Sequence, residues 1–352
     1  MPVSELVSQP ASTVLAAGAR RRRRIALGLA TAIASLVVVI VLSLMIGARP
    51  LSPAEVLAGL VDPRPGSPEA VVASLRWPRT MVGLLVGASL GLAGAVVQVV
   101  TRNPIADPGV LGINAGAALA VAIVVAAGAG GSPGALLLGA FCGSLVVATT
   151  VVVLALRSGR RGNPLESTLV GVAIAAVLTG VTVAIGLADP MAFARMQGWL
   201  AGSIAVYDVS LPAASALVVL VATVALICCA RGLGAVQLGE DVARSFGVPV
   251  GRITLLAVLI AALLASAATA VAGPIAFIGL VAPLIARAFA GPRFGWVLGL
   301  SAVFGAVVVV LADIVGRVLL TDGEVPAGIV ATFIGGPALI VAVRSGRLEG
   351  RR

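Results

Sequence analysis

The feature that most constrains this chain is a series of apolar stretches, each about 20 residues long, separated by short polar turns. A helix needs about 20 mostly apolar residues to cross the hydrocarbon core of a bilayer. The sequence therefore predicts an all-α, polytopic membrane protein with about ten transmembrane helices. The predicted spans are residues 25–46, 80–101, 109–128, 134–156, 165–187, 209–230, 253–272, 274–290, 295–318 and 325–343.

The composition argues against two soluble domains, which the length of 352 residues alone would allow. Hydrophobic residues make up 60% of the chain and charged residues 11%, against about 45–50% and about 25% in soluble domains. We expect one membrane domain at 25–344, between a basic tail at 1–24 and a short tail at 345–352. The longest polar island, at 231–252, is expected to be a cytoplasmic loop.

The arginines indicate how the chain is oriented. With a cytoplasmic N-terminus, eighteen of the 24 basic residues fall on the cytoplasmic side and six fall outside. This distribution follows the positive-inside rule, and ten spans return the C-terminus to the cytoplasm as well. The charge lies in loops between spans, so no nucleic acid partner is expected. We interpret the run Arg20–Arg24 as a topology determinant, with binding of anionic lipids as the alternative.

Two residue types are missing, and their absence excludes several activities. The chain has no Lys and no His. Without Lys there is no G-x-x-x-x-G-K-[ST] phosphate-binding loop, so any ATP hydrolysis must occur in another chain. Without His or clustered acids, neither a metal site nor an enzyme activity is expected. Asp313, the one acid well inside a predicted span, lies four residues before Arg317, which predicts an ion pair rather than a proton relay.

The stretch LRWPRT, residues 75–80, opens the second predicted span on its outer side. Arg76 and Arg79 are three residues apart, so they point in similar directions on a helix. One interpretation is a cationic patch that receives acidic side chains of a partner. The other is that both arginines extend to the membrane interface beside Trp77. The residues alone leave both interpretations open.

A glycine stripe follows on the same span. Gly83, Gly87 and Gly91 recur every four residues. Such a stripe allows a second helix to approach closely. We expect helix packing along this face, with a pore-lining role as the alternative.

The stretch TRNPIADPGVLGINAG, residues 101–116, interrupts two apolar runs with polar and helix-breaking residues. Pro104 disfavours helix at Asn103, so the second span is expected to stop there. Asp107 and Pro108 have the chemistry of an N-cap and a first helical residue. A simple cytoplasmic hairpin is one interpretation. Irregular backbone at membrane depth that lines a watery cavity is the other.

The polar island contains a second candidate site. Residues Val236–Phe246 are predicted to form a short amphipathic helix, with Val236, Ala243 and Phe246 on its apolar face and Glu240 on its polar face. Gly247 is expected to end it. This helix either lies on the membrane surface or is presented to a groove of a cytoplasmic partner.

Six motifs occur in order along the chain: LRWPRT, the glycine stripe, Q-x-x-x-RNPIADPGVLGINAGA, QLGEDVARSFGV, GPIAFIGLVAPLIAR and E-x-P-x-G-I-x-x-x-x-I-G-x-P. Together they resemble the FecCD-type permeases of ABC importers for ferric siderophores, haem and cobalamin, over about residues 25–344. The resemblance implies a multi-pass protein of the bacterial cytoplasmic membrane that pairs with a second permease subunit. It also implies two ABC ATPase subunits and an extracytoplasmic substrate-binding protein.

The resemblance also assigns roles to residues. Arg76, Arg79 and Arg317 match the outer arginines that receive glutamates of the binding protein. The cytoplasmic gate matches Asn103, Pro104 and Ile105, with Asn163 and Pro164 as a second gate. The coupling helix, which seats in a groove of the ATPase, matches Val236, Gln237, Leu238, Gly239, Glu240, Ala243, Phe246 and Gly247. Many relatives have a His where this chain has Leu284, so any role of that His is absent here.

The function implied is inward movement of a ferric siderophore by alternating access, driven by ATP hydrolysis in the partner. No cofactor is expected on this chain, and ATP and Mg are expected on the ATPase. The same machine importing cobalamin or haem is the alternative. An ion-coupled secondary transporter is a further alternative, which the scarcity of acids inside the spans disfavours.

Overall fold

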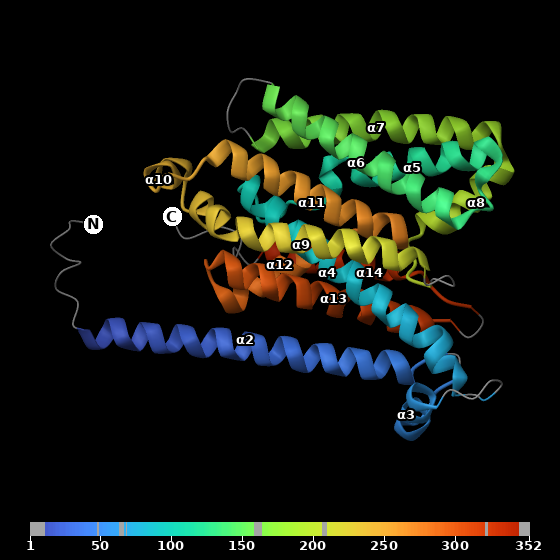
Figure 1. Cartoon of the computed structure of the whole chain (residues 1–352), viewed down its shortest axis with the longest axis horizontal. Coiled ribbons are helices and arrows are strands. Elements are labelled where there is room, and N and C mark those ends of the chain that lie inside the picture. Colours follow the sequence, from blue (N-terminus) through green and yellow to red (C-terminus); the bar gives the residue numbers. More distant parts are fainter. Residues whose placement is uncertain are drawn as a thin grey trace.

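The computed structural model describes residues 11–344, except 48, 63–66, 68, 158–163, 206–209 and 321–322. Across these residues the chain forms helices and no strand, and most helices run along one common axis (Figure 1). Seven helices are long and apolar enough to cross a membrane, by length and composition, and three shorter helices are also apolar. Each predicted span coincides with one of these helices. The predicted all-α, polytopic architecture is therefore confirmed.

The helices follow one another with short connections. In chain order they are α2 (Ala11–Met45), α3 (Pro53–Val61), the π-helix η1 (Val72–Arg76), α4 (Trp77–Val100), the 3₁₀-helix η2 (Pro108–Leu111), α5 (Ile113–Val124), the π-helix η3 (Val125–Ala129), α6 (Pro133–Arg157), α7 (Pro164–Ala188), α8 (Pro190–Leu200), α9 (Ser210–Gln237), α10 (Glu240–Ser245), α11 (Val250–Ala272), α12 (Ile278–Ala290), α13 (Phe294–Val318) and α14 (Ala327–Arg344).

Helices α4, α11 and α13 form the centre of the bundle. Their apolar windows are 78%, 67% and 67% buried, whereas those of α2, α6, α7 and α9 are only 17–28% buried. Glycine allows the central helices to approach closely. A Cβ on Gly87 would lie 2.3 Å from the carbonyl oxygen of Gly305, and one on Gly91 would lie 2.1 Å from that of Ser301. Gly87 and Gly91 of the stripe therefore lie against the backbone of α13, whereas Gly83 faces the side chains of Ile204 and Val310.

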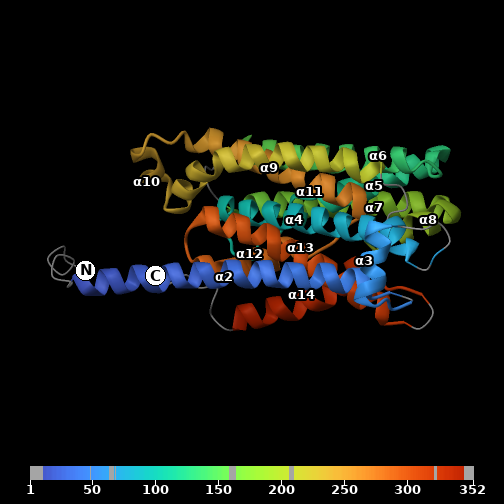
Figure 2. The same cartoon turned by 60° about the horizontal axis from the view of Figure 1, so that its bottom comes forward.

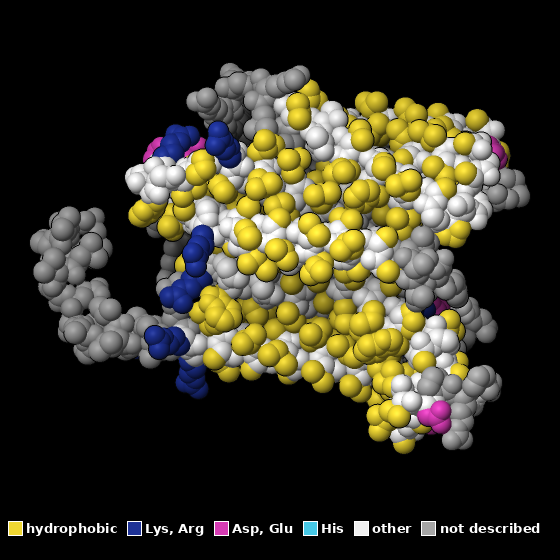
Figure 3. Space-filling view, viewed as in Figure 1, with side chains coloured by type: hydrophobic (Ala, Val, Ile, Leu, Met, Phe, Trp, Pro, Cys, Tyr) yellow, Lys and Arg dark blue, Asp and Glu magenta, His cyan; other side chains and the backbone are white. Residues whose placement is uncertain are grey.

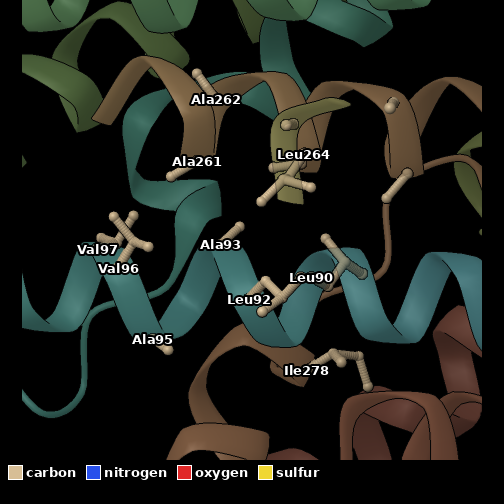
Figure 4. Packing of buried hydrophobic residues seen from close by; sticks show 14 of the residues in the cluster. Leu90, Leu92, Ala93, Ala95, Val96, Val97, Ala261, Ala262, Leu264 and Ile278 are labelled. Carbon is tan, nitrogen blue, oxygen red and sulfur yellow. The ribbon is translucent and has the colours of Figure 1, made fainter. Parts of the chain in front are cut away.

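The opposite side of α4 packs against α11 through small and medium-sized side chains. Ala93 and Val97 of α4 belong to one buried cluster with Ala261 and Leu264 of α11. Figure 4 shows these residues between the two ribbons, with Ile278 at the start of α12 on the other side of α4. Contact on both sides explains why α4 is the most buried span.

The bundle has two distinct ends, which we call the α3 end and the α10 end after the helices that mark them (Figures 1 and 2). Helix α2 begins and α14 finishes toward the α10 end. On the face shown in Figure 3, arginine side chains gather at the α10 end, and hydrophobic side chains cover the middle. The middle belt is the surface expected to contact lipid.

Two local predictions need correction. Pro108 starts a 3₁₀ turn instead of the next span, because Gly112 with φ of 73° separates that turn from α5. The second correction concerns α10 and is described with its site. The division into a basic tail at 1–24 and a membrane domain stays a prediction; helix α2 begins at Ala11 and includes the run Arg20–Arg24.

Candidate functional site

Arg76 is buried at the α3 end. It is 7% exposed, and its Nη1 donates hydrogen bonds to the carbonyl oxygens of Leu44 at 2.7 Å and Met45 at 2.9 Å. Its Nη2 also donates to the carbonyl oxygen of Arg49. The last carbonyls of a helix have no partner within the helix. Arg76 therefore caps the C-terminal end of α2.

Arg317 has a similar role from the end of α13. It is also 7% exposed, and its Nη1 donates to the carbonyl oxygens of Ser43 at 2.8 Å and Ile46 at 3.1 Å. Its Nη2 pairs with Asp313, one helical turn earlier. The predicted ion pair between Asp313 and Arg317 is confirmed. The guanidinium of Arg317 thus joins the ends of α2 and α13.

Asp313 is shared with a third arginine. Arg79, at the start of α4, donates from Nε at 3.0 Å and from Nη2 at 2.6 Å to Oδ1 of Asp313. Its Nη2 also lies 2.7 Å from Oε2 of Glu324. The side chain of Asp313 is 1% exposed and that of Glu324 is 45% exposed. We call Arg76, Arg79, Arg317, Asp313 and Glu324 the arginine cluster.

The arginine cluster bears on the predicted docking site. It brings the three arginines of the prediction together at one end. Two of them, Arg76 and Arg317, have their guanidinium groups committed to α2 carbonyls. The pair Arg79 and Glu324 lies nearer the surface, with side chains 16% and 45% exposed. Docking of a binding protein at these arginines stays a prediction.

The gate stretch is irregular backbone between α4 and α5. Arg102 has φ of 50°, a left-handed conformation that is uncommon for a residue with a side chain. The side-chain oxygen of Asn103 accepts a hydrogen bond from the N–H of Ile105 at 3.1 Å, which closes a tight turn. The carboxylate of Asp107 accepts from the N–H of Gly109 at 2.8 Å and caps η2. Local side chains therefore replace the hydrogen bonds that a helix would provide.

This loop contacts the start of α12. A Cβ on Gly279 would lie 2.4 Å from Cδ of Pro108 and 3.1 Å from Oδ2 of Asp107. From α4, Nε2 of Gln98 donates to the carbonyl oxygen of Gly279 at 3.2 Å. A residue larger than glycine at position 279 would displace the loop.

A cavity of about 420 Å³ opens beside this junction. Ile105 lies at the cavity and is itself 41% exposed. Phe277 holds a left-handed backbone with φ of 68° just before α12. The lining residues are Ile105, Asp107, Gly109, Asn114, Gly171, Val172, Ala175, Ala276, Phe277, Leu280 and Leu339. Ile105, a predicted gate residue, thus borders an open space between α5, α7, α12 and α14.

The second predicted gate is only partly described. Asn163 lies outside the described residues, and Pro164 is the first residue of α7.

At the α10 end, the predicted helix Val236–Phe246 is wrong in extent. Helix α9 continues to Gln237, a turn follows, and α10 comprises only Glu240–Ser245. Gly239 has φ of 120°, a conformation that glycine adopts readily and that breaks the helix. Val236 is buried within α9 and Ala243 is buried under α10, whereas Phe246 is 72% exposed. These three residues therefore do not share one face.

Three large apolar side chains of this segment are exposed beside the charged residues of α10. Leu238, Val242 and Phe246 are 66%, 41% and 72% exposed. Val242 and Phe246 are four residues apart, the spacing that places side chains on one side of a helical turn. Leu238 lies in the turn that precedes α10. Val242 was not singled out from the sequence, although its spacing from Phe246 would have identified it. The exposed apolar side chains suit insertion into an apolar groove.

One ion pair connects α10 to the gate loop. Nη2 of Arg102 lies 3.1 Å from Oε1 of Glu240, and Nη2 of Arg244 lies 3.0 Å from Oε2 of the same carboxylate. Arg102 immediately precedes Asn103, a predicted gate residue. Glu240 therefore links the exposed helix to the start of the predicted gate loop, a contact between residues 138 positions apart.

The comparison with known families can now be set beside this geometry. A sequence model described as the FecCD transport family matches residues 35–345. The chain belongs to the FecCD transport family. It is a multi-pass permease of a bacterial inner membrane.

Individual FecCD-type relatives cover most of the chain. It is 38% identical over 309 residues to the ferric enterobactin transport system permease protein FepD of Escherichia coli K12, covering 88% of this chain and 92% of FepD. It is 34% identical over 264 residues to the hemin transport system permease protein HmuU of Yersinia pestis, covering 74% and 78%. A solved metal-chelate type ABC transporter in an inward-facing conformation superimposes with a TM-score of 0.79 at 25% identity, covering 90% of this chain and 98% of that one.

Proposed function

We propose that this chain is the permease subunit of an ATP-driven importer that moves a ferric siderophore inward by alternating access. The α10 end is then cytoplasmic, and the α3 end faces the substrate-binding protein. Relatives named as permeases for ferric enterobactin, iron(3+)-hydroxamate and Fe(3+)-citrate support an iron chelate as the cargo. No ATP-binding loop lies in this sequence, so ATP and Mg are proposed to bind to two partner ATPase subunits.

The main structural support for this proposal is the contact between Glu240 and Arg102, which joins α10 to the predicted gate loop. An ATPase groove that holds the exposed apolar side chains of Leu238, Val242 and Phe246 would move α10 when the ATPase closes. Glu240 would then transmit that movement to Arg102 and the gate turn that follows it. The left-handed backbone of Arg102 costs of order 1–3 kcal/mol. This segment can therefore relax to another conformation when the ion pair changes.

Exposed apolar side chains on α7 and α14 support the proposal that this chain pairs with a second permease subunit. On α7, Leu169, Val177 and Leu187 are 66%, 67% and 79% exposed, and on α14 Phe333 is 77% exposed. Helices α7 and α14 also border the cavity beside the gate. A path formed between two copies, or between this chain and a similar one, would place these helices and both gates around it.

At the α3 end, the arginine cluster refines the docking proposal. An incoming glutamate would first meet the exposed pair Arg79 and Glu324, and it would compete with Glu324 for the guanidinium. Arg76 and Arg317 would act mainly by holding α2 in place. Replacing Glu324 by Gln is then expected to strengthen binding-protein association, whereas Arg79→Glu is expected to abolish it.

Experiments can distinguish this proposal from two kinds of alternative, a different cargo and a different energy source. The similarity to HmuU favours haem as a second candidate cargo, and cobalamin is a third. An ion-coupled secondary transporter predicts that uptake collapses with a protonophore while ATP is maintained. The ABC proposal predicts that uptake persists under that condition.

The decisive experiment measures uptake of radioactive iron on a panel of siderophores, with labelled haem and cobalamin in parallel, in cells with and without this chain. Loss for a siderophore class would support the proposed cargo, and loss for haem or cobalamin alone would replace it.

The proposed link between Glu240 and Arg102 is tested by reversing the charge of each residue. Arg102→Glu and Glu240→Arg are each expected to uncouple ATPase activity from uptake, and the double variant is expected to restore part of the coupling. Equal loss in the single and double variants would contradict the proposed link.

A further inference from the structure

Helix α3 is a fixed element rather than a loose loop. Its N-terminus has a capping box in which the N–H of Ser52 donates to Oε2 of Glu55 at 2.7 Å and the N–H of Glu55 donates to Oγ of Ser52 at 3.3 Å. A Cβ on Gly59 would lie 2.3 Å from the carbonyl oxygen of Glu69. Val56 and Val72 are both buried in the same small cluster. Helix α3 therefore packs closely against η1.

The opposite face of α3 has no partner within the described chain, and it is entirely apolar. Leu57, Leu60 and Val61 are 63%, 41% and 75% exposed. The other exposed positions of the helix are Pro53, Ala54 and Ala58. At 100° per residue these six side chains occupy one continuous side of the helix. Glu55 lies on the side that faces the chain.

The position of α3 shows what lies next to this face. Helix α3 projects sideways beyond the end of α2, at the edge of the bundle rather than above its centre (Figures 1 and 2). The exposed face of α2 is itself apolar, with Val37, Val38 and Val41 54%, 53% and 45% exposed. In Figure 3 the hydrophobic surface along α2 continues to the corner that α3 occupies. The apolar face of α3 is thus continuous with a surface that is expected to contact lipid.

We propose that α3 lies in the membrane interface at the α3 end, with Leu57, Leu60 and Val61 inserted at the boundary between headgroups and acyl chains. A helix with one apolar side and no charge on that side fits this environment. Glu55, the charged residue within α3, lies off that apolar side and pairs with Arg49.

The anchor has a structural consequence. Helix α3 packs on η1, and η1 ends with Arg76, which holds the last carbonyls of α2. A lipid contact at α3 would therefore fix the depth of the arginine cluster relative to the bilayer. This inference does not depend on the proposed cargo or on the ATPase.

The test uses spin labels on the full chain reconstituted into lipid nanodiscs, with Cys142, Cys228 and Cys229 replaced by Ala. Single cysteines at Leu57 and Leu60 carry the label, with Val41 as the lipid-facing control and Arg49 as the exposed control at the same end. The measurement compares collision with oxygen, which concentrates in lipid, and with a water-soluble nickel chelate.

Labels at Leu57 and Leu60 are expected to favour oxygen over the nickel chelate, with a ratio between those at Val41 and Arg49. A ratio equal to that at Arg49 would overturn the proposal. So would protection from nickel that appears only after a binding protein or a second permease is added, because the face would then be a protein interface. Retained uptake activity in each labelled variant verifies that the chain is folded.

Discussion

The two ends of this permease differ in how deeply their ion pairs are buried. At the α3 end, Asp313 and Arg317 have side chains 1% and 3% exposed and form a network that joins α2, α4 and α13. At the α10 end, Arg102 and Glu240 have side chains 51% and 35% exposed and form a single pair between a loop and a short helix. Buried pairs are costly to break, whereas exposed pairs contribute little to stability.

The backbone conformations of the two ends differ as well. The α3 end caps its helices, through Arg76 on α2 and through the capping box of α3. Toward the α10 end the gate loop has a left-handed Arg102, and α10 follows a break at Gly239. The α3 end is therefore held by buried pairs and helix caps, whereas the α10 end is joined to the neighbouring loop by an exposed pair and irregular backbone.

The largest loss of stability is expected when Asp313 is replaced. Asp313→Ala would leave Arg79 and Arg317 without their shared carboxylate, and removing one partner of a buried pair costs about 3–5 kcal/mol. We expect reduced stability in equilibrium unfolding of the purified protein in detergent. A variant as stable as the original chain would show that the network is not structural and would remove the contrast between the ends.

A smaller loss of stability is expected when Gly316 is replaced by Ala. A Cβ on Gly316, near the arginine cluster, would lie 2.1 Å from the carbonyl oxygen of Val325. Overpacking of this kind costs about 1–3 kcal/mol. Gly251, at the start of α11, has no atom within 4 Å of an added Cβ and provides the matched control. Gly251→Ala is expected to be neutral or to stabilise by about 0.5–1 kcal/mol. Equal destabilisation by both would contradict this assignment.

At the α10 end, Glu240→Ala is expected to change the free energy of unfolding by less than about 1 kcal/mol, because the pair is exposed. Its effect on coupling between ATP hydrolysis and uptake is expected to be much larger. Unfolding in detergent and coupled uptake in proteoliposomes would be measured on the same preparation. A large loss of stability would place Glu240 with the structural residues and weaken the comparison.

The smallest effect concerns the cap of α3. Hydrogen bonds from the backbone N–H and then the hydroxyl of Ser52 lower the pKa of Glu55, with a smaller contribution from Arg49. A carboxyl whose folded pKa is lowered contributes stability above its unfolded pKa and loses it as pH falls through the folded pKa. We expect a spin label at Leu57 to become more mobile only at acidic pH. Glu55→Gln should remove this pH dependence, and an unchanged profile in that variant would exclude Glu55 as its source.

Most of the fold was predictable from the sequence because each span is set by a local run of apolar residues. The helix starts at Pro133 and Pro164 lie within one residue of the predicted spans. The exceptions are positions where backbone conformation overrides hydropathy. Gly112 delays α5, and Gly239 divides the predicted helix of the polar island. A composition-based prediction has no information about which glycine takes a left-handed conformation.

The candidate site was less predictable, since its contacts join distant segments. The spacing of Asp313 and Arg317 revealed their pair, because it lies within one helix. The capping of α2 by Arg76 and the pairing of Arg102 with Glu240 depend on how helices are placed in space. No periodicity in the sequence encodes those distances.

The hydrogen bonds from Arg317 to the end of α2 also bear on biogenesis. Their donor follows the acceptor carbonyls by 274 and 271 residues. Chains are synthesised at about 5–20 residues per second, so the ribosome needs of order tens of seconds to supply this arginine after α2. During that interval the first helix inserts without its final cap, and a chain truncated before Arg317 never acquires it. Membrane quality control would thus meet an incomplete permease in which Arg76 alone can cap the first helix, without the hydrogen bonds from Arg317.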